Sequence, residues 1–233
     1  MIDTHLLLIE GPPGSGKSTT AELLAAKIVK TGKACQCFPE WHPDHPIAIG
    51  SDLDLEQVVS TAIAREGEVL QQWQQFARSR QTNEVVTVME SRFWQTSVML
   101  MYAAGSPLEH VLDSNRQVIE AVLPLKPALI YFAMDDLRAL TTRTIEIKEA
   151  EWQRAGFPGT WVGHIYTALE DQNWFTRRSL TGLEAYLAFL EEWAQVSEQL
   201  YDGLPFSKVT IRNPYQDWTA AMDQMREFLG LPK

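Results

Sequence analysis

The chain alternates short, continuous apolar runs with longer segments whose apolar residues recur at the spacing of a helix face. The first run, Leu-Leu-Leu-Ile at residues 6–9, is followed by residues 19–29, where apolar residues return every three or four positions. The run at 85–89, Val-Val-Thr-Val-Met, consists largely of residues that favour strands. Runs of this kind predict strands at 6–9, 33–38, 85–89, 128–133 and 208–211.

Helical spacing predicts helices at 19–29, 54–80, about 93–104, about 109–123 and 183–200, and also from Leu137 and from Trp218 onward. Strands that alternate with helices need crossover connections, which place helices on both faces of a parallel sheet. We therefore expect an α/β fold of three layers with a parallel sheet of about five strands. The pattern contains no interdomain linker, so we expect a single domain over residues 1–233.

The segment at about 144–203 is rich in aromatic residues and is predicted to be a lid or helical segment. Within it, residues 183–200 have the periodicity of a helix that packs in a core. Residues 154–161 contain two glycines and a proline, which predict a loop that can close over a site.

Composition narrows the class of protein. With 233 residues, 45% hydrophobic and 21% charged, the chain has the make-up of a globular domain with a real core. It contains no apolar stretch long enough for a membrane span and no secretory signal, so we expect a cytoplasmic protein without a membrane partner.

Charge and cysteine content favour a small-molecule partner. The net charge of −10 argues against a nucleic-acid polymer, because proteins that bind one use basic surfaces. The two cysteines, Cys35 and Cys37, fall on one face of a predicted strand. We interpret them as small buried side chains, with a metal site that includes His42 and His45 as the alternative.

The most specific motif is Gly-Pro-Pro-Gly-Ser-Gly-Lys-Ser at residues 11–18, between the first predicted strand and the first predicted helix. In this setting, successive backbone N–H groups point at one anion, and the glycines allow the close approach. Lys17 would place a cation near the β- and γ-phosphates, and Ser18 would bind Mg²⁺. The predicted nucleotide-binding residues are Gly11, Pro12, Pro13, Gly14, Ser15, Gly16, Lys17, Ser18 and Thr19.

Acidic residues follow three other predicted strands. Glu40 follows the second strand, Glu90 and Arg92 follow the third, and Asp135 follows the fourth. Ligands of parallel sheets bind outside the carboxyl ends of the strands, so we expect these side chains to converge with the phosphate loop on one cleft. Asp135 and Asp136 are alternatively interpreted as helix-start residues.

These features resemble the P-loop nucleoside and nucleotide kinases, specifically the deoxynucleoside kinase and thymidylate kinase branch. The resemblance covers roughly residues 5–145. It rests on the phosphate loop, on Pro39-Glu40 and on Glu90-Ser91-Arg92-Phe93, and the strand at 127–132 is also similar to the fourth strand of the family. It implies a three-layer P-loop fold, ATP and Mg²⁺ as cofactors, and often a homodimer.

Two features depart from the family pattern. Acid and arginine are adjacent in the family, whereas Ser91 separates Glu90 from Arg92 here. Either Glu90 matches the family acid, or Arg92-Phe93 matches and Ser91 stands at the acid position. The closely spaced lid arginines of the family have no clear counterpart among Arg138, Arg143, Lys148, Arg154, Arg177 and Arg178.

Phosphoryl transfer asks a protein for positioning and charge neutralisation. We expect Lys17, Glu40 and Arg92 to be catalytic, with Glu40 as the base that accepts the proton of a substrate hydroxyl. Glu90 is expected to bind Mg²⁺ together with Ser18. Arg92 would hold the acceptor or form a salt bridge with Glu40 or Glu90.

For the acceptor pocket we expect Trp41, Trp73 and Gln75, with Phe93 or Trp94 beside them, because flat rings stack on a base and an amide binds its edge. The alternative is that Trp73 and Phe76 belong to the core and that the glutamines face solvent.

We therefore predict an ATP- and Mg²⁺-dependent kinase that phosphorylates a hydroxyl of a nucleoside or nucleoside-like acceptor. The alternatives are a nucleoside monophosphate kinase, an antibiotic phosphotransferase on the same scaffold, and a nucleotide-dependent switch or binding protein that has no acceptor.

Overall fold

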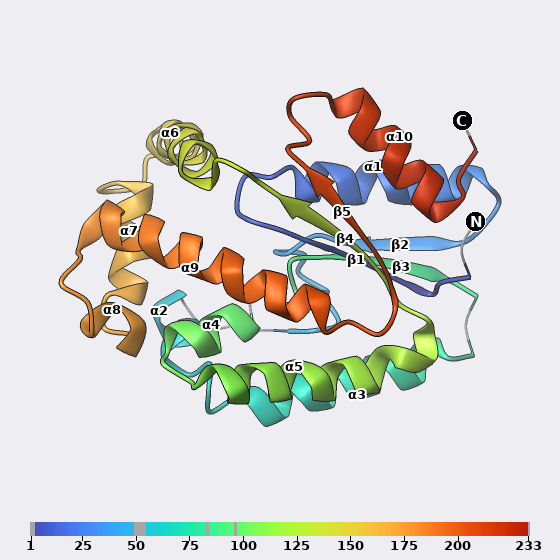
Figure 1. Cartoon of the computed structure of the whole chain (residues 1–233), viewed down its shortest axis with the longest axis horizontal. Coiled ribbons are helices and arrows are strands. Elements are labelled where there is room, and N and C mark those ends of the chain that lie inside the picture. The colour runs from blue at the N-terminus through green and yellow to red at the C-terminus, as the bar shows by residue number, and fades with distance from the viewer. Residues whose placement is uncertain (1–2, 49–54, 83, 96, 233) are drawn as a thin grey trace.

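A parallel sheet in the order β2-β3-β1-β4-β5 forms the centre of the molecule (Figure 1). The computed structural model describes residues 3–48, 55–82, 84–95 and 97–232. The strands are β1 (Leu6–Glu10), β2 (Cys35–Phe38), β3 (Val86–Glu90), β4 (Ala128–Ala133) and β5 (Ser207–Arg212). The predicted five-stranded parallel sheet is therefore confirmed within the described residues.

Helices cover both faces of the sheet. The helices are α1 (Lys17–Lys30), α2 (Leu55–Ser60), α3 (Glu66–Arg80), α4 (Val98–Ala103), α5 (Leu108–Val122), α6 (Leu137–Arg154), α7 (Trp161–Leu169), α8 (Asn173–Thr176), α9 (Gly182–Asp202) and α10 (Trp218–Leu229), with a 3₁₀ turn, η1, at Leu123–Leu125. Figure 1 shows α1 and α10 on one face of the sheet, with α3, α5 and part of α9 on the other. This arrangement confirms the predicted three layers.

Alternation along β1 explains why two cores form. Leu6 and Leu8 pack with α3, α5 and α9, whereas Leu7 and Ile9 point the opposite way and pack with α1 and α10. Both sets are almost completely buried, as expected for a parallel strand covered on both faces.

A third apolar cluster lies beyond the carboxyl ends of the strands and joins α2, α4, α6, α7, α8 and α9. The helix predicted at 183–200 is α9, and Phe189 and Leu190 on it are buried in this cluster, which confirms its core assignment. The predicted loop at 154–161 corresponds to residues 155–160, between α6 and α7. Trp152, on α6, contacts this loop: its Nε1–H donates to the Pro158 carbonyl at 3.0 Å.

Two helix predictions were wrong in their bounds. The helix expected at 54–80 is two helices, α2 and α3, separated by a turn at 61–65, and residue 54 lies outside the described residues. The helix expected from Phe93 begins at Val98. The N–H groups of Phe93 and Trp94 instead donate to the Glu10 carboxylate at 2.9 and 3.0 Å, and a side chain that accepts such bonds holds the segment in a turn.

None of the helices that the structure describes combines the length and apolar character of a membrane span.

Candidate functional site

The phosphate loop connects the end of β1 to the start of α1, as the sequence predicted. Gly14 and Gly16 have φ angles of 78° and 90°, in the left-handed region that favours glycine. Gly16 is the N-cap of α1, so the loop feeds directly into a helix N-terminus, where free N–H groups and the helix dipole favour an anion.

Other segments enclose this loop. A Cβ atom added to Gly14 would lie less than 3.0 Å from the Thr144 side chain on α6, so the loop and α6 are in direct contact. On the other side, the Tyr215 hydroxyl donates to the Gly14 carbonyl, and the rings of Tyr215 and Trp218 stack 6.2 Å apart beside Gly16. The segment after β5 therefore covers the loop, which the sequence pattern did not reveal.

A cavity of about 870 Å³ opens above the carboxyl ends of β1, β2 and β3. Its size lies toward the upper end of the range for ligand pockets, roughly 300–1,000 Å³. Helices α2, α4, α6, α7 and α9 complete its wall. The predicted site residues that line it are Pro13, Gly14, Gly16, Lys17, Ser18, Thr19, Glu40, Trp41 and Glu90.

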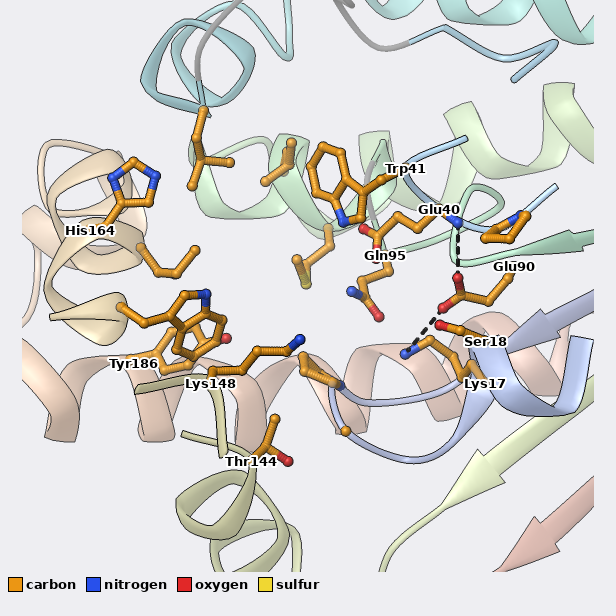
Figure 2. A pocket seen from close by; sticks show the side chains of 18 of the residues that line it. Lys17, Ser18, Glu40, Trp41, Glu90, Gln95, Thr144, Lys148, His164 and Tyr186 are labelled. Carbon is orange, nitrogen blue, oxygen red and sulfur yellow. Dashed lines mark hydrogen bonds and ion pairs between the residues drawn. The ribbon is translucent and has the colours of Figure 1, made fainter. Parts of the chain in front are cut away.

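Lys17, Glu40 and Glu90 meet at the mouth of the phosphate loop (Figure 2). The Lys17 Nζ atom lies 3.9 Å from Glu90 Oε1 and donates to the Pro12 carbonyl at 2.9 Å. The Glu40 N–H donates to Glu90 Oε2 at 2.9 Å, which ties the end of β2 to the end of β3. Glu90 is buried, so the partners that surround it offset the cost of removing its charge from water.

Ser91, the residue that separates the acid Glu90 from Arg92, adopts a left-handed backbone conformation. Its φ angle is 62°, an uncommon value for a residue other than glycine, and its hydroxyl donates to Glu90 Oε1 at 2.7 Å. The left-handed turn leaves the Glu90 carboxylate beside Lys17. Of the two residues considered for the acid position, Glu90 is the one whose carboxylate lies beside Lys17, and its assignment to that position stays a prediction.

Arg92 contacts the backbone instead of a carboxylate. Its Nη2 donates to the Glu40 carbonyl, and its guanidinium lies 5.6 Å from the Trp41 ring centroid. Arg92 is 5% exposed, and burial lowers its pKa against the opposing effect of Glu40 and Glu90. Its Nε and Nη1 have no hydrogen-bond partner in the described part of the chain. Arg92 does not line the cavity, so its geometry is that of a support for Glu40 and Trp41.

Glu10 is a buried acid that the sequence analysis missed. It is 2% exposed, lies directly before the phosphate loop and accepts the Phe93 and Trp94 N–H groups through Oε1. Burial is the main cause that raises its pKa to about 8. One signal was available: Glu10 has the same parity as Leu6 and Leu8, so alternation places it on a core-facing side of β1.

The predicted acceptor residues divide between cavity and core. Trp41 lines the cavity and is 70% exposed. Trp73 and Phe93 are at most 1% exposed and pack against each other with centroids 6.0 Å apart, and Gln75 is exposed on α3 outside the cavity lining. The structure therefore corrects the prediction for these three residues: α3 packs under the sheet, away from the strand ends.

Gln95 and Tyr186 line the cavity in their place (Figure 2). Gln95 lies in the turn that follows Glu90, and its position five residues beyond that acid was the available signal. Tyr186 lies on α9 between core residues, and periodicity along one helix does not distinguish a cavity from a core.

Three of the six charged residues considered for a lid are paired with acidic side chains. Arg138 pairs with Glu184 and Glu191, and Arg178 pairs with Glu192. Lys148 lines the cavity from α6 and pairs with Glu151 at 2.8 Å.

The acids after β4 do not join the site. Asp136 accepts from the Ala139 N–H as the N-cap of α6, so the helix-start interpretation is correct for this residue. Asp135 instead pairs with Arg212 and Asn213 at the ends of β4 and β5.

The two cysteines on β2 do not form a metal site with other residues that the structure describes. Burial raises the pKa of both Cys35 and Cys37 to about 11. Within the described residues, no group of three or more His, Cys, Asp or Glu side chains is placed to hold a metal ion, so the Cys-His alternative has no geometric support.

Comparison with known proteins shows which fold the chain has. The chain is similar to a solved structure of thymidylate kinase from Candida albicans, with a TM-score of 0.53 and 14% sequence identity over 96% of this chain and 91% of that chain. No protein-family model matches the chain, and neither does any curated protein sequence. At this identity the likeness shows the fold alone, which is the three-layer P-loop fold expected from the sequence.

Proposed function

We propose that this protein is an ATP- and Mg²⁺-dependent kinase that transfers the γ-phosphoryl group to a hydroxyl of a nucleoside or nucleoside-like molecule. The observation that carries the proposal is that Lys17, at the start of α1, lies at the phosphate loop of one large cavity together with Glu40 and Glu90, which stand at the carboxyl ends of β2 and β3. Phosphoryl transfer requires a cation on the transferred group, an oxygen ligand for the metal and an acid–base group near the acceptor.

The loop residues are suited to hold the phosphates of ATP. The glycines bring backbone N–H groups close to an anion at the N-terminus of α1, and Lys17 adds a flexible cation. In this structure Lys17 Nζ is hydrogen-bonded to the Pro12 carbonyl, and phosphate oxygens would replace that acceptor.

The residues at the loop also fit Mg²⁺. Ser18 and Glu90 line the same cavity and provide hydroxyl and carboxylate oxygens, the donors that Mg²⁺ prefers. Two protein ligands are sufficient, because Mg²⁺ in phosphate sites completes its coordination with phosphate oxygens and water. When bound, the ion would neutralise charge on the phosphates.

Glu40 is the proposed base for the acceptor hydroxyl. Its side chain lines the cavity, while its backbone is fixed from two sides, by Glu90 at its N–H and by Arg92 at its carbonyl. A base must be held within hydrogen-bond reach of the proton that it accepts, and two backbone anchors favour such positioning.

The likeness to a thymidylate kinase structure favours the second candidate, a nucleoside monophosphate kinase. A phosphate-bearing acceptor calls for arginines that bind it bidentately. Among the described residues, no arginine lines the cavity, so we place the hydroxyl acceptor first. The aromatic wall at Trp152 and Trp161 keeps an antibiotic acceptor as a third candidate.

Acceptor-dependent release of ADP tests the proposal. The purified protein with Mg-ATP is screened against nucleosides, nucleotides and hydroxylated antibiotics, and at least one is expected to stimulate turnover. Glu40→Gln should lower kcat about 100-fold or more and leave the KM for ATP unchanged. Asp44→Asn, an equal charge change at an exposed position of the same loop, is the control.

The alternatives predict different results. A switch protein would hydrolyse ATP at the same rate with every compound and would be indifferent to Glu40→Gln. A nucleoside monophosphate kinase would respond to nucleotides and not to nucleosides.

A further inference from the structure

The far wall of the cavity, opposite the phosphate loop, is almost entirely apolar. Its side chains come from helices that do not carry the phosphate-binding residues: α2, α4, α7 and α9. They include Val58, Val59, Leu100, Trp161, Ile165 and Phe189. Apolar walls of this kind bind ligands by removing carbon surface from water.

Charge is concentrated near the phosphate loop. Lys17, Glu40 and Glu90 lie together at that end. Beyond them the lining contains two histidines and Lys148, and Lys148 already pairs with Glu151. Within the described residues, the lining beyond the charged end thus contains one lysine, which already has an acidic partner, and no arginine that could bind a phosphate dianion bidentately.

Tyr186 brings one polar group into this apolar wall. Tyr186 is 6% exposed as a residue and lines the cavity. Within the described part of the chain no hydrogen bond joins its hydroxyl to another residue, and the hydroxyl is not one of the fully buried unpaired atoms, so it is open to the cavity. The negative charge of Glu40 adds to burial in raising the Tyr186 pKa, which places the two side chains within electrostatic reach. A hydroxyl that is open to the cavity and bonded to no protein group can donate to, or accept from, a ligand that fills the cavity.

We propose that the acceptor is an uncharged, hydroxyl-bearing aromatic compound whose apolar body lies against the far wall and forms a hydrogen bond with the Tyr186 hydroxyl. Tyr186 then determines specificity without taking part in the transfer, while Glu40 faces the reacting hydroxyl. This inference rests on the proposed function only in treating the cavity as the acceptor site.

Direct binding tests the charge preference without requiring turnover. The donor site is filled with ADP and Mg²⁺, and the protein is titrated calorimetrically with adenosine, thymidine, their monophosphates and the neutral aromatic diol chloramphenicol. At least one neutral compound should bind with a Kd below ~1 mM, and each monophosphate should bind at least ~10-fold more weakly than its nucleoside. Tighter binding of a monophosphate, or no binding by any neutral compound, would overturn the proposal.

A matched pair of variants tests Tyr186. Tyr186→Phe keeps the ring and removes the hydroxyl, and we expect roughly 3- to 10-fold weaker binding of the best neutral compound, the value of one neutral hydrogen bond. The KM for ATP should not change. Tyr166→Phe is the control, because this ring packs on Phe175 from α7 and lies outside the cavity lining.

The outcomes separate this inference from the proposed function. Equal binding by Tyr186→Phe and wild type would refute the role of the hydroxyl, provided that both melt at the same temperature. A neutral compound that binds through Tyr186 but is never phosphorylated would refute the kinase proposal and leave the acceptor-site inference standing.

Discussion

Replacing Glu10 with glutamine tests whether a neutral carboxyl group supports the turn beneath the phosphate loop. Glu10 is buried, and its pKa rises from 4.5 to about 8, mainly because burial penalises its charged form. At pH values between 4.5 and about 8, the Glu10 carboxyl group loses its proton in the unfolded chain but keeps it in the folded chain. The free energy of unfolding therefore falls as pH rises, by about 1.4 kcal/mol per pH unit, and the loss is complete above about pH 8.

Over the whole interval the wild-type protein should lose about 5 kcal/mol at this position, an order-of-magnitude figure. Glutamine has nearly the same shape, stays neutral and keeps an oxygen that accepts the Phe93 and Trp94 N–H groups. Glu10→Gln should thus match wild type below about pH 4.5 and become progressively more stable than wild type as the pH rises toward 8.

Urea unfolding of both proteins between pH 5.5 and pH 8.5 measures this difference directly. All other titrating groups are shared, so they cancel when the two free energies of unfolding are subtracted at each pH. Glu120→Gln, at an exposed position of α5, controls for the loss of a charge. A difference between Glu10→Gln and wild type that stays constant with pH would refute a raised pKa at Glu10.

Two further substitutions test the supports of the site. Arg92→Met removes a buried guanidinium with two N–H groups that lack partners among the described residues, so stability should change by less than about 1 kcal/mol while acceptor-dependent turnover falls about 10-fold or more. A loss of stability above about 3 kcal/mol would instead assign Arg92 to the fold. Gly14→Ala should destabilise by more than the 1–2 kcal/mol that a left-handed backbone costs, because its Cβ also meets Thr144. Thr144→Ala added to Gly14→Ala should recover part of that loss in urea unfolding, and no recovery would contradict the contact.

The sequence predicted those parts of the site that depend on strand ends. Lys17, Glu40 and Glu90 follow strands, and parallel strands end at one edge of the sheet, so their proximity follows from topology alone. The phosphate loop was predictable for the same reason, since motif, strand and helix are adjacent in the chain.

The far wall of the cavity could not be predicted because it depends on how helices pack. Trp73 and Tyr186 both lie within predicted helices, and helical periodicity alone does not distinguish a core residue from a cavity residue. Only the packing of α3 beneath the sheet and of α9 across its carboxyl edge separates a core residue from a cavity residue. The missed turn at Phe93 has a similar cause, because the Glu10 carboxylate that accepts the Phe93 N–H lies 83 residues away in the chain.

The direct pairing of β4 with β5 has a consequence for how such a protein can change over generations. The two strands pair along their full lengths, although α6, α7, α8 and α9 lie between them in the chain. The sheet edge is therefore fixed by backbone bonds and does not depend on the side chains that these helices present to the cavity. Substitutions on the cavity side of residues 137–202 can accumulate while the strand ends stay in place. Descendants of one gene can thus change the cavity that these helices line while the phosphate loop and the strand ends keep their geometry.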